Sequence, residues 1–377
     1  MQFKILWFVL SWLFKRVKKT RKDKRARDVR DNKNRDKNNE PQKSKKSKKS
    51  LSPVSQNPLL LFSLLSASGA GLAGVALFLY GTKVETRKYR LESMPVRLAG
   101  NVGSAHKQVK KSLRILHLSD LHLAGGKDDA EKVAFIQRIS DDDFDLVILT
   151  GDVFEFGNGI KYGEKLLSRQ PRLGAYAVFG NHDYYDYTML NKTLGRVVRS
   201  MRHPPEKKDV SAHKAALEAG GFTVLVNETR YLEGEDIFIV GIDYPGIKED
   251  HLMELMQGAP PNALKLGLFH LPRKLDMMDR AGLNIAFGGH THGGQVRLPG
   301  VGAIVTDSEL ARHEASGLVR RGNTTFHISR GLGADPRSNI RIFCPPAATE
   351  LAVEFDSHGK SQDAPYSLVS GQGKGRV

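Results

Sequence analysis

Five short polar blocks between residues 120 and 292 contain side chains of the types that bind metal ions. The blocks are Asp120-Leu121-His122, Gly151-Asp152, Gly180-Asn181-His182-Asp183, His270 and Gly289-His290-Thr291-His292. Four of them closely follow apolar runs typical of buried strands, namely Leu113–Leu118, Leu146–Thr150, Ala175–Phe179 and Ile285–Phe287. Because the carboxyl ends of neighbouring strands converge on one crevice in α/β sheets, we expect the blocks to form one site. A single Asp or His after a strand is more often a turn residue, but five blocks in order are poorly explained in that way.

The ligand types in these blocks favour two divalent metal ions. Imidazole and carboxylate suit first-row ions such as Mn, Fe, Zn or Ni, and thiolate is excluded as a common ligand because the chain has one cysteine. In extended backbone, residues i and i+2 point the same way, so Asp120 and His122 can bind at one site, as can the pair in His290–His292. A carboxylate such as Asp152 can bridge two ions. Such a pair of ions polarises a phosphoryl oxygen and generates hydroxide near neutral pH for in-line attack.

His182 is expected to face the substrate rather than the metal ions. It directly follows the ligand Asn181, and neighbouring side chains in a loop usually diverge. From there the imidazole could stabilise the transition state or protonate the leaving oxygen. Asp183 would orient that imidazole and support its charge, although an Asp in this place is also common as a loop or N-cap residue.

The ordered set of blocks resembles the pattern of the calcineurin-like metallophosphoesterases: D-x-H, GD, GNH[DE], a lone H and GHxH, over roughly residues 112–356. The resemblance implies an α/β (α+β) fold, a four-layer αββα sandwich, with His182 as the catalytic residue. It implies two divalent ions, with Mn as the first choice and Fe, Zn or Mg as alternatives. The implied ligands are Asp120, His122, Asp152 and His292 for one ion, and Asp152, Asn181, His270 and His290 for the other.

Two later segments, Gly288–Pro299 and Ser329–Gly333, are similar to a membrane-associated branch of that family. The branch contains YkuE-like phosphoesterases and a UDP-2,3-diacylglucosamine diphosphatase of lipid A synthesis. The resemblance implies hydrolysis of a phosphoester or diphosphate bond in a membrane-associated substrate, with UDP-2,3-diacylglucosamine as the candidate. One alternative is an extracytoplasmic phosphodiesterase that acts on phospholipid or an envelope polymer. A catalytically inactive binding scaffold is a third, disfavoured by the intact His182 and the complete ligand set.

The positive charge is concentrated near the N-terminus. The 377-residue chain has a net charge of +17, and residues 15–50 alone contain 18 Lys/Arg against 5 Asp/Glu. Because the catalytic region is nearly neutral and has no basic stripe, no nucleic-acid partner is expected. The arm over residues 15–57 is too polar to bury a core and should be disordered. A solvated tail and attraction to anionic lipid headgroups are both compatible with its composition.

Residues 58–80 run 23 positions without a charged side chain and predict a membrane anchor. This length can cross a hydrocarbon core of about 30 Å at about 1.5 Å per residue. We expect an uncleaved single-pass helix in the cytoplasmic (inner) membrane, because a cleaved signal peptide would be shorter and closer to the N-terminus. Residues 1–14 form a shorter apolar run that suits an interfacial helix.

The side of the membrane on which the catalytic domain lies stays open. The basic residues before the anchor favour a cytoplasmic N-terminus and hence a catalytic domain outside the cytoplasm. A UDP-sugar substrate would instead require the cytoplasmic face. Membrane lipids and a phosphorylated or diphosphate-linked lipid substrate are the expected partners in either case.

Between the anchor and the C-terminus we expect a polar connector (81–111), the catalytic domain (112–356) and a flexible tail (357–377). Lys127–Ser140 predicts an amphipathic helix. Strands alternating with helices early and strand-rich sequence late favour two packed sheets flanked by helices. The further β-rich runs are Phe222–Val226, Ile237–Ile242, Leu266–Phe269, Phe326–Ile328, Ile340–Phe343 and Leu351–Phe355.

Thr188–Arg202 predicts a basic amphipathic helix close to His182 in sequence. It is either an ordinary surface helix or a lid that dips into lipid and offers Arg196 and Arg199 to phosphates. Tyr184 could line the same pocket.

Other residues of similar type have less specific interpretations. His117 lies inside the first predicted strand and should be packed there, and His327 is expected to be a surface or core residue. Cys344 is expected to be buried rather than reactive.

Overall fold

The computed structural model describes residues 71–98, 112–187, 205–334 and 339–355. The chain divides into two units, Met1–Ala76 and Leu77–Val377. Residues 71–79 are helical. The sheets and the candidate site belong to the second unit.

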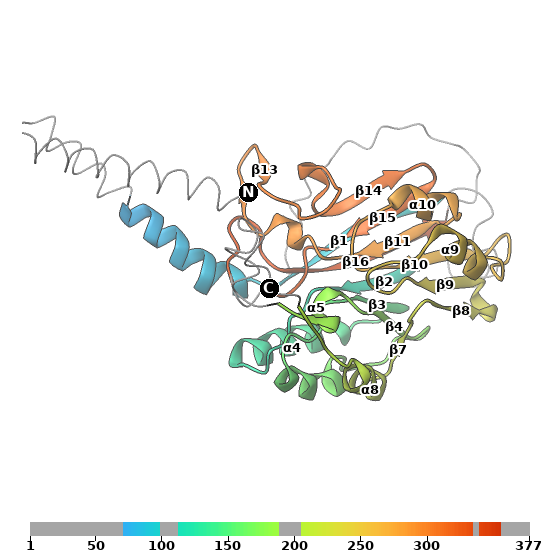
Figure 1. The fold of residues 1–377 in the computed structure, drawn as a ribbon, viewed down its shortest axis with the longest axis horizontal. Coiled ribbons are helices and arrows are strands. Elements are labelled where there is room, and N and C mark those ends of the chain that lie inside the picture. Colours follow the sequence, from blue (N-terminus) through green and yellow to red (C-terminus); the bar gives the residue numbers. More distant parts are fainter. Residues whose placement is uncertain (1–70, 99–111, 188–204, 335–338, 356–377) are drawn as a thin grey trace, which may run out of the picture. The chain divides into compact units, whose positions relative to one another are not determined.

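Two six-stranded mixed sheets form the centre of this unit, in the orders β1-β16-β2-β3-β4-β7 and β14-β15-β11-β10-β9-β8 (Figure 1). The first sheet consists of β1 (Arg90–Leu98), β16 (Ala347–Phe355), β2 (Ser112–Leu118), β3 (Leu146–Thr150), β4 (Ala175–Val178) and β7 (Phe222–Val224). The second consists of β14 (Gly317–Arg321), β15 (Thr324–Ile328), β11 (Ile285–Gly288), β10 (Leu264–Leu268), β9 (Ile237–Gly241) and β8 (Glu228–Leu232). Two short ribbons pair β5 (Tyr185–Asp186) with β6 (Glu206–Lys207) and β12 (Arg297–Leu298) with β13 (Gly302–Ala303).

The central strands of each sheet run parallel, which brings their carboxyl ends to one edge. Strands β2, β3, β4 and β7 are parallel neighbours in the first sheet. Strands β9, β10, β11 and β15 are parallel neighbours in the second. The loops after β2, β3, β4, β10 and β11 carry the predicted ligands.

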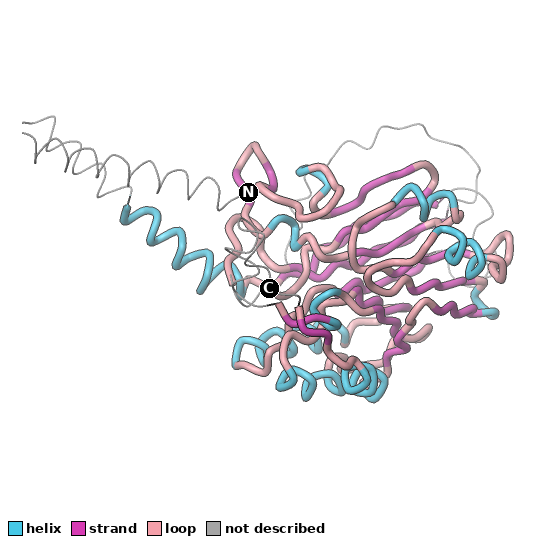
Figure 2. The backbone as a smooth tube through the Cα atoms, in the orientation of Figure 1, coloured by secondary structure: helices cyan, strands magenta, loops and turns pink. Residues whose placement is uncertain are grey.

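Helices cover the outer faces of both sheets (Figures 1 and 2). On the first sheet lie α4 (Lys127–Ser140), α8 (Ser211–Ala219) and the 3₁₀ segment η4 (Gly157–Lys165), and on the second lie α9 (Glu249–Met256) and α10 (Leu275–Arg280). The shorter elements are η2 (Tyr80–Val84), η3 (Glu85–Arg87), α5 (Asn181–Tyr184), η6 (Glu233–Glu235), η7 (His292–Gly294) and η8 (Arg312–Glu314).

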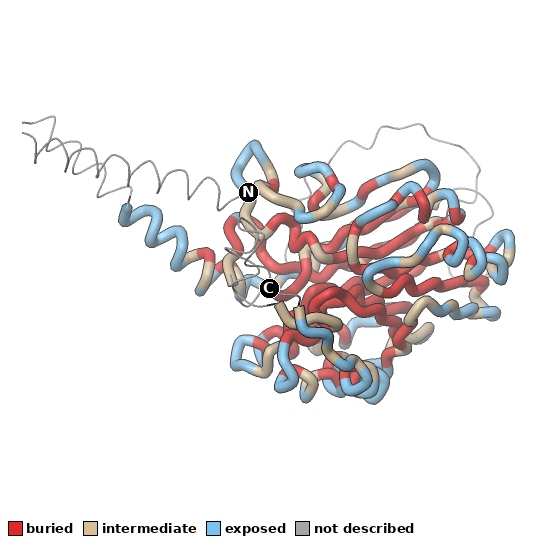
Figure 3. Tube along the Cα trace, in the orientation of Figure 1, coloured by how far each residue is buried: buried red, intermediate tan, exposed pale blue. Residues whose placement is uncertain are grey.

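Strand β3 shows how its sequence produces these layers. All five of its residues are buried, and much of both sheets is buried in the same way (Figure 3). Val147 and Leu149 pack in the core under α4 and α8, whereas Leu146 and Ile148 pack in the core between the two sheets. Because successive side chains of a strand point to opposite faces, a continuous apolar run is what a strand covered on both faces requires. The predicted arrangement of two packed sheets flanked by helices is confirmed.

Most of the predicted elements are confirmed, and two differ. Helix α4 has the predicted bounds, whereas Ile340–Phe343 forms no strand and only Ile342 makes an isolated bridge to Val296. Residues 90–98, expected in a polar connector, instead form β1, which pairs in parallel with β16. Its only buried side chain is Val96, so this edge strand has no apolar alternation by which its sequence could have revealed it.

The prediction of a membrane-spanning helix over residues 58–80, and of the inner-membrane location based on it, is corrected. Within the described part of the chain, no helix combines the length and apolar character needed to cross a membrane. Within the predicted segment 58–80, residues 71–79 are helical. This helix continues into a π-helical turn, η2, and then into the short η3. Residues 58–70 lie outside the described residues, as do the predicted interfacial segment (1–14), basic arm (15–57), basic helix (188–202) and tail (357–377).

The place of β1 in the core can be tested through Val96, whose side chain is 3% exposed. We expect Val96→Ala to lower the free energy of unfolding by about 1–2 kcal/mol, because it removes buried methyl groups and leaves a cavity. Urea unfolding followed by circular dichroism measures the change. The neighbouring Arg97 has an exposed side chain paired with Glu354, so Arg97→Ala should stay within about 0.5 kcal/mol of the parent. If Val96→Ala lowered the free energy of unfolding no more than Arg97→Ala does, β1 would add nothing to the core.

Candidate metal centre

The seven predicted ligands all lie at the shared edge of the two sheets. Each follows the carboxyl end of a strand: Asp120 and His122 after β2, Asp152 after β3, Asn181 after β4, His270 after β10, and His290 and His292 after β11. The first four come from one sheet and the last three from the other. Packing of the sheets against each other therefore assembles the centre.

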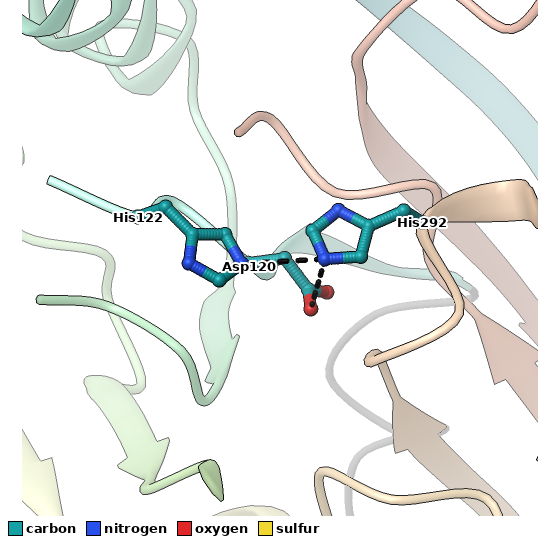
Figure 4. Close-up of side chains that lie close together, drawn as sticks. All are labelled: Asp120, His122 and His292. Carbon is teal, nitrogen blue, oxygen red and sulfur yellow. Dashed lines mark hydrogen bonds and ion pairs between the residues drawn. The ribbon is translucent and has the colours of Figure 1, made fainter. Parts of the chain in front are cut away.

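One cluster consists of Asp120, His122 and His292, whose donor atoms face one another (Figure 4). His122 Nε2 lies 3.2 Å from His292 Nε2, and His292 Nε2 lies 3.5 Å from Asp120 Oδ1. All three residues are buried. They form one compact set of two nitrogens and one oxygen.

A second cluster consists of Asp152, His270 and His290, with Asn181 beside them. The Asn181 amide oxygen lies 2.9 Å from His290 Nδ1 and 3.2 Å from His270 Nε2. His270 Nε2 is also 3.2 Å from Asp152 Oδ2 and 3.3 Å from His290 Nδ1. This set likewise provides nitrogen and oxygen donors around one point.

The Asp152 carboxylate connects the two clusters. Its Oδ2 lies 3.8 Å from His122 Nε2 and 3.2 Å from His270 Nε2, while Oδ1 accepts the backbone N–H of His182 at 2.7 Å. Burial opposes its ionisation, but the imidazoles of His270 and His182 outweigh burial and hold the pKa of Asp152 well below its usual range. Asp152 therefore has the position and charge of a bridging ligand.

The hydrogen bonds made by two of the histidines show that their other ring nitrogens can bind divalent cations. His122 places Nδ1 2.9 Å from Glu155 Oε2, and His270 places Nδ1 2.9 Å from the Thr150 carbonyl oxygen. Each acceptor requires a hydrogen on Nδ1, so in the neutral ring Nε2 carries a lone pair directed into its cluster. Lone pairs of imidazole and carboxylate at such short separations repel each other unless a proton or a metal cation lies between them, and against the effect of burial Asp152 raises the pKa of His270 to about 10. The residues present therefore match a two-metal centre of mixed imidazole, carboxylate and amide ligands.

The backbone at five of the ligands adopts the left-handed conformation that side chains other than glycine rarely adopt. The φ angles are 51° at Asp120, 46° at His122, 51° at Asp152, 69° at His290 and 50° at His292. Each such residue costs on the order of 1 kcal/mol or more, and this kind of strain is concentrated at functional sites. The loops after β2, β3 and β11 are thus shaped for the positions of their side chains rather than for local stability.

Gly289 shows how tightly these loops approach each other. A Cβ at this position would lie 2.0 Å from Ser119 Oγ and 2.5 Å from Asp120 Oδ2. Only glycine leaves space for the Asp120 carboxylate, which accepts the next backbone N–H, from His290, at 3.0 Å through Oδ1.

His182 lies beside the first cluster, and its partner differs from the predicted one. Its ring centroid is 4.8 Å from that of His122, and its Nδ1 is 2.7 Å from Glu155 Oε2. The same Glu155 oxygen contacts His122 Nδ1. Glu155 therefore holds both imidazoles, although nothing in its sequence spacing marks it as a site residue.

Asp183, predicted to orient His182, instead holds the backbone. Its Oδ1 accepts the N–H groups of Val153 and Phe154, both at 3.0 Å, and its Oδ2 accepts that of Gly180 at 2.9 Å. The carboxylate thus joins the loop after β3 to the loop after β4. The physical reason is its place at the third position of the short helix α5, where a carboxylate turns back to the N-terminal N–H groups.

The pKa shifts separate the roles of these groups. Burial lowers the pKa of His182 below its usual range, although Asp152 and Glu155 act in the opposite direction. Burial alone would raise the pKa of Glu155, but hydrogen bonds with His122 and His182 bring it well below its usual range. Burial and the charge of Asp152 raise the pKa of Asp183 to about 6. Glu155 is thus the fixed negative charge next to His182.

The remaining predicted site residues lie apart from the clusters or outside the described chain. The Tyr184 hydroxyl donates to Asp243 Oδ2 at 2.5 Å, and its ring packs edge-on against Phe179. The ring beside His182 is that of Tyr187, with centroids 5.0 Å apart. Arg196 and Arg199 lie outside the described residues.

Arg341 is a further residue that the sequence did not reveal. It is fully buried, and its guanidinium donates to backbone carbonyls that include those of His292 (3.4 Å), Cys344 (3.1 Å) and Arg330 (2.8 Å). It therefore joins the loop of His292 to the segments around residues 330 and 344. Cys344 is buried as predicted.

Comparison with known proteins agrees with this geometry. Residues 113–294 match the model of the calcineurin-like phosphoesterase family. The metallophosphoesterase YkoQ of Bacillus subtilis is 28% identical over 279 residues, which cover 72% of this chain and 93% of YkoQ. YkuE of the same organism is 24% identical over 306 residues, covering 78% of this chain and 95% of YkuE. The UDP-2,3-diacylglucosamine pyrophosphatase LpxG of Chlamydia muridarum is 24% identical over 322 residues, covering 75% of this chain and 95% of LpxG.

Metal titration tests the centre directly. We expect the metal-stripped protein to bind about two Mn²⁺ per chain, and saturation at about 100 times Kd to add about 2.7 kcal/mol of stability for each site. Asp152→Asn should weaken binding at both positions, because its carboxylate belongs to both clusters, and His292→Gln should weaken one. Isothermal titration calorimetry and thermal unfolding measure these effects. His251→Gln, on the exposed face of α9, is the control and should bind as the parent does. Unchanged binding in Asp152→Asn would rule out the bridging position.

Proposed function

This chain belongs to the calcineurin-like metallophosphoesterases, and we propose that it hydrolyses a phosphoester or diphosphate bond at the centre formed by Asp120 to His292. It is a metal-dependent phosphoester hydrolase by family. The observation that carries the proposal is the position of Asp152 Oδ2, between His122 Nε2 of one cluster and His270 Nε2 of the other. A carboxylate shared by two such clusters can hold two cations side by side, which is the arrangement that two-metal phosphoester hydrolysis uses.

In this proposal each cluster holds one divalent cation. Asp120, His122, Asp152 and His292 are the ligands of the first, and Asp152, Asn181, His270 and His290 are those of the second. When bound, the cations polarise a phosphoryl oxygen and make an attacking water more acidic. The chain's own contribution is to fix the donor atoms in advance through the strained loops and the shared carboxylate.

His182 is proposed as the group that handles the proton of the leaving oxygen. Its Nδ1 is held by Glu155 at 2.7 Å, which leaves Nε2 as the nitrogen that exchanges a proton. The negative Glu155 stabilises the imidazolium form, while burial favours the neutral form. An imidazole balanced in this way can donate a proton to an alkoxide or phosphate leaving group and be recharged by water.

The proposed substrate is a lipid-linked nucleoside diphosphate, with UDP-2,3-diacylglucosamine as the candidate. LpxG, which carries that substrate in its name, aligns over 75% of this chain and 95% of its own length. Hydrolysis would add water across the diphosphate and give UMP and diacylglucosamine 1-phosphate. This would place the chain in lipid A synthesis.

The activity can be tested on purified protein loaded with Mn²⁺ or Mg²⁺. We expect hydrolysis of bis-p-nitrophenyl phosphate, and faster hydrolysis of UDP-2,3-diacylglucosamine than of phospholipid phosphodiesters. His182→Ala should lower kcat by about 10²–10⁴-fold while metal binding is retained, because it removes general acid–base catalysis. His251→Gln again serves as the control. A folded, metal-loaded protein without turnover would refute the hydrolase, and preference for phospholipid would refute the nucleotide substrate alone.

Glu155 and Asp183 should respond differently to neutralisation. Glu155→Gln removes the charge that holds His182 and His122, so we expect kcat to fall by on the order of 10–100-fold with little loss of stability. Asp183→Asn places an N–H donor against a backbone N–H, so we expect a loss of about 2 kcal/mol in unfolding free energy. Steady-state kinetics measures kcat and thermal unfolding measures stability in both variants. A catalytic defect confined to Asp183→Asn would restore Asp183 as the partner of His182.

A further inference from the structure

A continuous hydrogen-bonded chain of buried side chains leads from the second sheet to the metal ligand Asp120. Its links are His327 Nδ1 to His117 Nδ1 (2.6 Å), His117 Nε2 to Thr150 Oγ1 (2.8 Å), Thr150 Oγ1 to Ser119 Oγ (2.8 Å) and Ser119 Oγ to Asp120 Oδ2 (2.6 Å). We call it the His327–Asp120 chain. None of its side chains is more than 1% exposed. It crosses from β15 of the second sheet to β2 and β3 of the first.

The donor and acceptor of every hydrogen bond in the chain can be assigned by starting from the Asp120 carboxylate. An ionised carboxylate only accepts hydrogen bonds, so Ser119 must donate to Asp120. The Ser119 hydroxyl also lies 2.9 Å from the Thr150 carbonyl oxygen, but the carboxylate is closer and is the stronger acceptor. With its hydrogen used in this way, Ser119 accepts from the Thr150 hydroxyl.

The same reasoning fixes the tautomers of both histidines. Thr150 donates to Ser119, so His117 must donate to Thr150 through Nε2–H. If His117 is neutral, its Nδ1 then carries a lone pair, and His327 must donate to it through Nδ1–H. Both rings are neutral, since burial lowers the pKa of His117 well below its usual range and that of His327 to about 3. All four hydrogen bonds therefore point towards Asp120.

We propose that the His327–Asp120 chain positions the Asp120 carboxylate for its metal ion, and that His117 and His327 are positioning residues of the centre. Hydrogen bonds aligned in one direction polarise and strengthen one another in a buried environment. Ser119 holds Oδ2, the His290 N–H lies between Oδ1 (3.0 Å) and Oδ2 (3.1 Å), and Oδ1 lies 3.5 Å from His292 Nε2. The proposal rests on the proposed role of Asp120 as a ligand.

The position of the chain in the core supports this assignment. The His117 ring packs edge-on against Phe287 of β11, in the apolar core between the sheets. Polar side chains in such a core destabilise the fold unless each one is satisfied. Here the two hydroxyls and the two imidazoles are all hydrogen-bonded along the chain only when its four bonds form together. The carboxylate, the hydroxyls and the imidazoles are therefore held as one unit.

Thr150 provides the matched pair of variants for the test. Thr150→Val keeps the shape of the side chain and removes the hydroxyl in the middle of the chain, whereas Thr150→Ser keeps the hydroxyl. We expect Thr150→Val to weaken Zn²⁺ binding at one of the two positions by on the order of 10–100-fold, as loss of outer partners of metal ligands does elsewhere. Thr150→Ser should restore the parent affinity. Competition with a chelating dye measures binding in the full-length protein, without any assay of activity. Equal affinities in the two variants would overturn the proposal.

A spectroscopic measurement on the parent protein gives an independent answer, even if Thr150→Val does not fold. In ¹⁵N-histidine-labelled protein loaded with Zn²⁺, two-bond ¹H–¹⁵N correlations should show His117 with its hydrogen on Nε2 and His327 with its hydrogen on Nδ1. His327→Leu assigns the second ring. The opposite tautomers, or a charged ring at either position, would overturn the proposal.

Asp120→Asn separates failure of this proposal from failure of the proposed centre. Unchanged Zn²⁺ binding in Asp120→Asn would refute Asp120 as a ligand, and the positioning role with it. Weakened binding in Asp120→Asn together with parent-like binding in Thr150→Val would leave the ligand assignment intact and refute the His327–Asp120 chain alone.

Discussion

The close spacing of the proposed metal ligands is the constraint around which the rest of this domain is built. His122 Nε2 and His292 Nε2 are 3.2 Å apart, and Asp152 Oδ2 lies between donors of both clusters. Donors from loops of both sheets must be held at these separations. The loops hold them there because they leave strands whose apolar side chains are packed between two covered sheets. The core therefore keeps the proposed ligands together.

The same constraint accounts for the unusual backbone of the site. Left-handed φ angles at Asp120, His122 and Asp152 turn the chain sharply after β2 and β3. Local preferences oppose these conformations, so they persist only where surrounding contacts fix them. Asp183 provides such contacts by accepting N–H groups from the loops after both β3 and β4. Its role is thus to hold the turn that carries Asp152, which explains why the sequence places an acid next to His182 without pairing the two.

The sequence predicted what depends on residue type and order, and not what depends on tertiary contacts. The proposed ligands could be chosen from the sequence because each is Asp, Asn or His and follows an apolar strand, and the structure brings them together at one edge. Glu155 could not be identified, because a carboxylate three residues beyond Asp152 has no specific spacing, and its role arises from the approach of two rings. Strand β1 was missed because an edge strand with one buried residue lacks alternation. The apolar content of residues 58–80 was read as a spanning helix, although composition does not determine where a helix begins or ends.

Contacts behind the first cluster also couple its residues to their surroundings. Glu155 joins the ligand His122 to the proposed proton donor His182, so a shift of one ring moves the other. Arg341 fixes the backbone of His292 to segments that follow β15. Both of these residues are buried. Movement of one sheet relative to the other would therefore misalign the proposed ligands and the proposed proton donor together, so the proposed reaction requires a rigid core between the sheets.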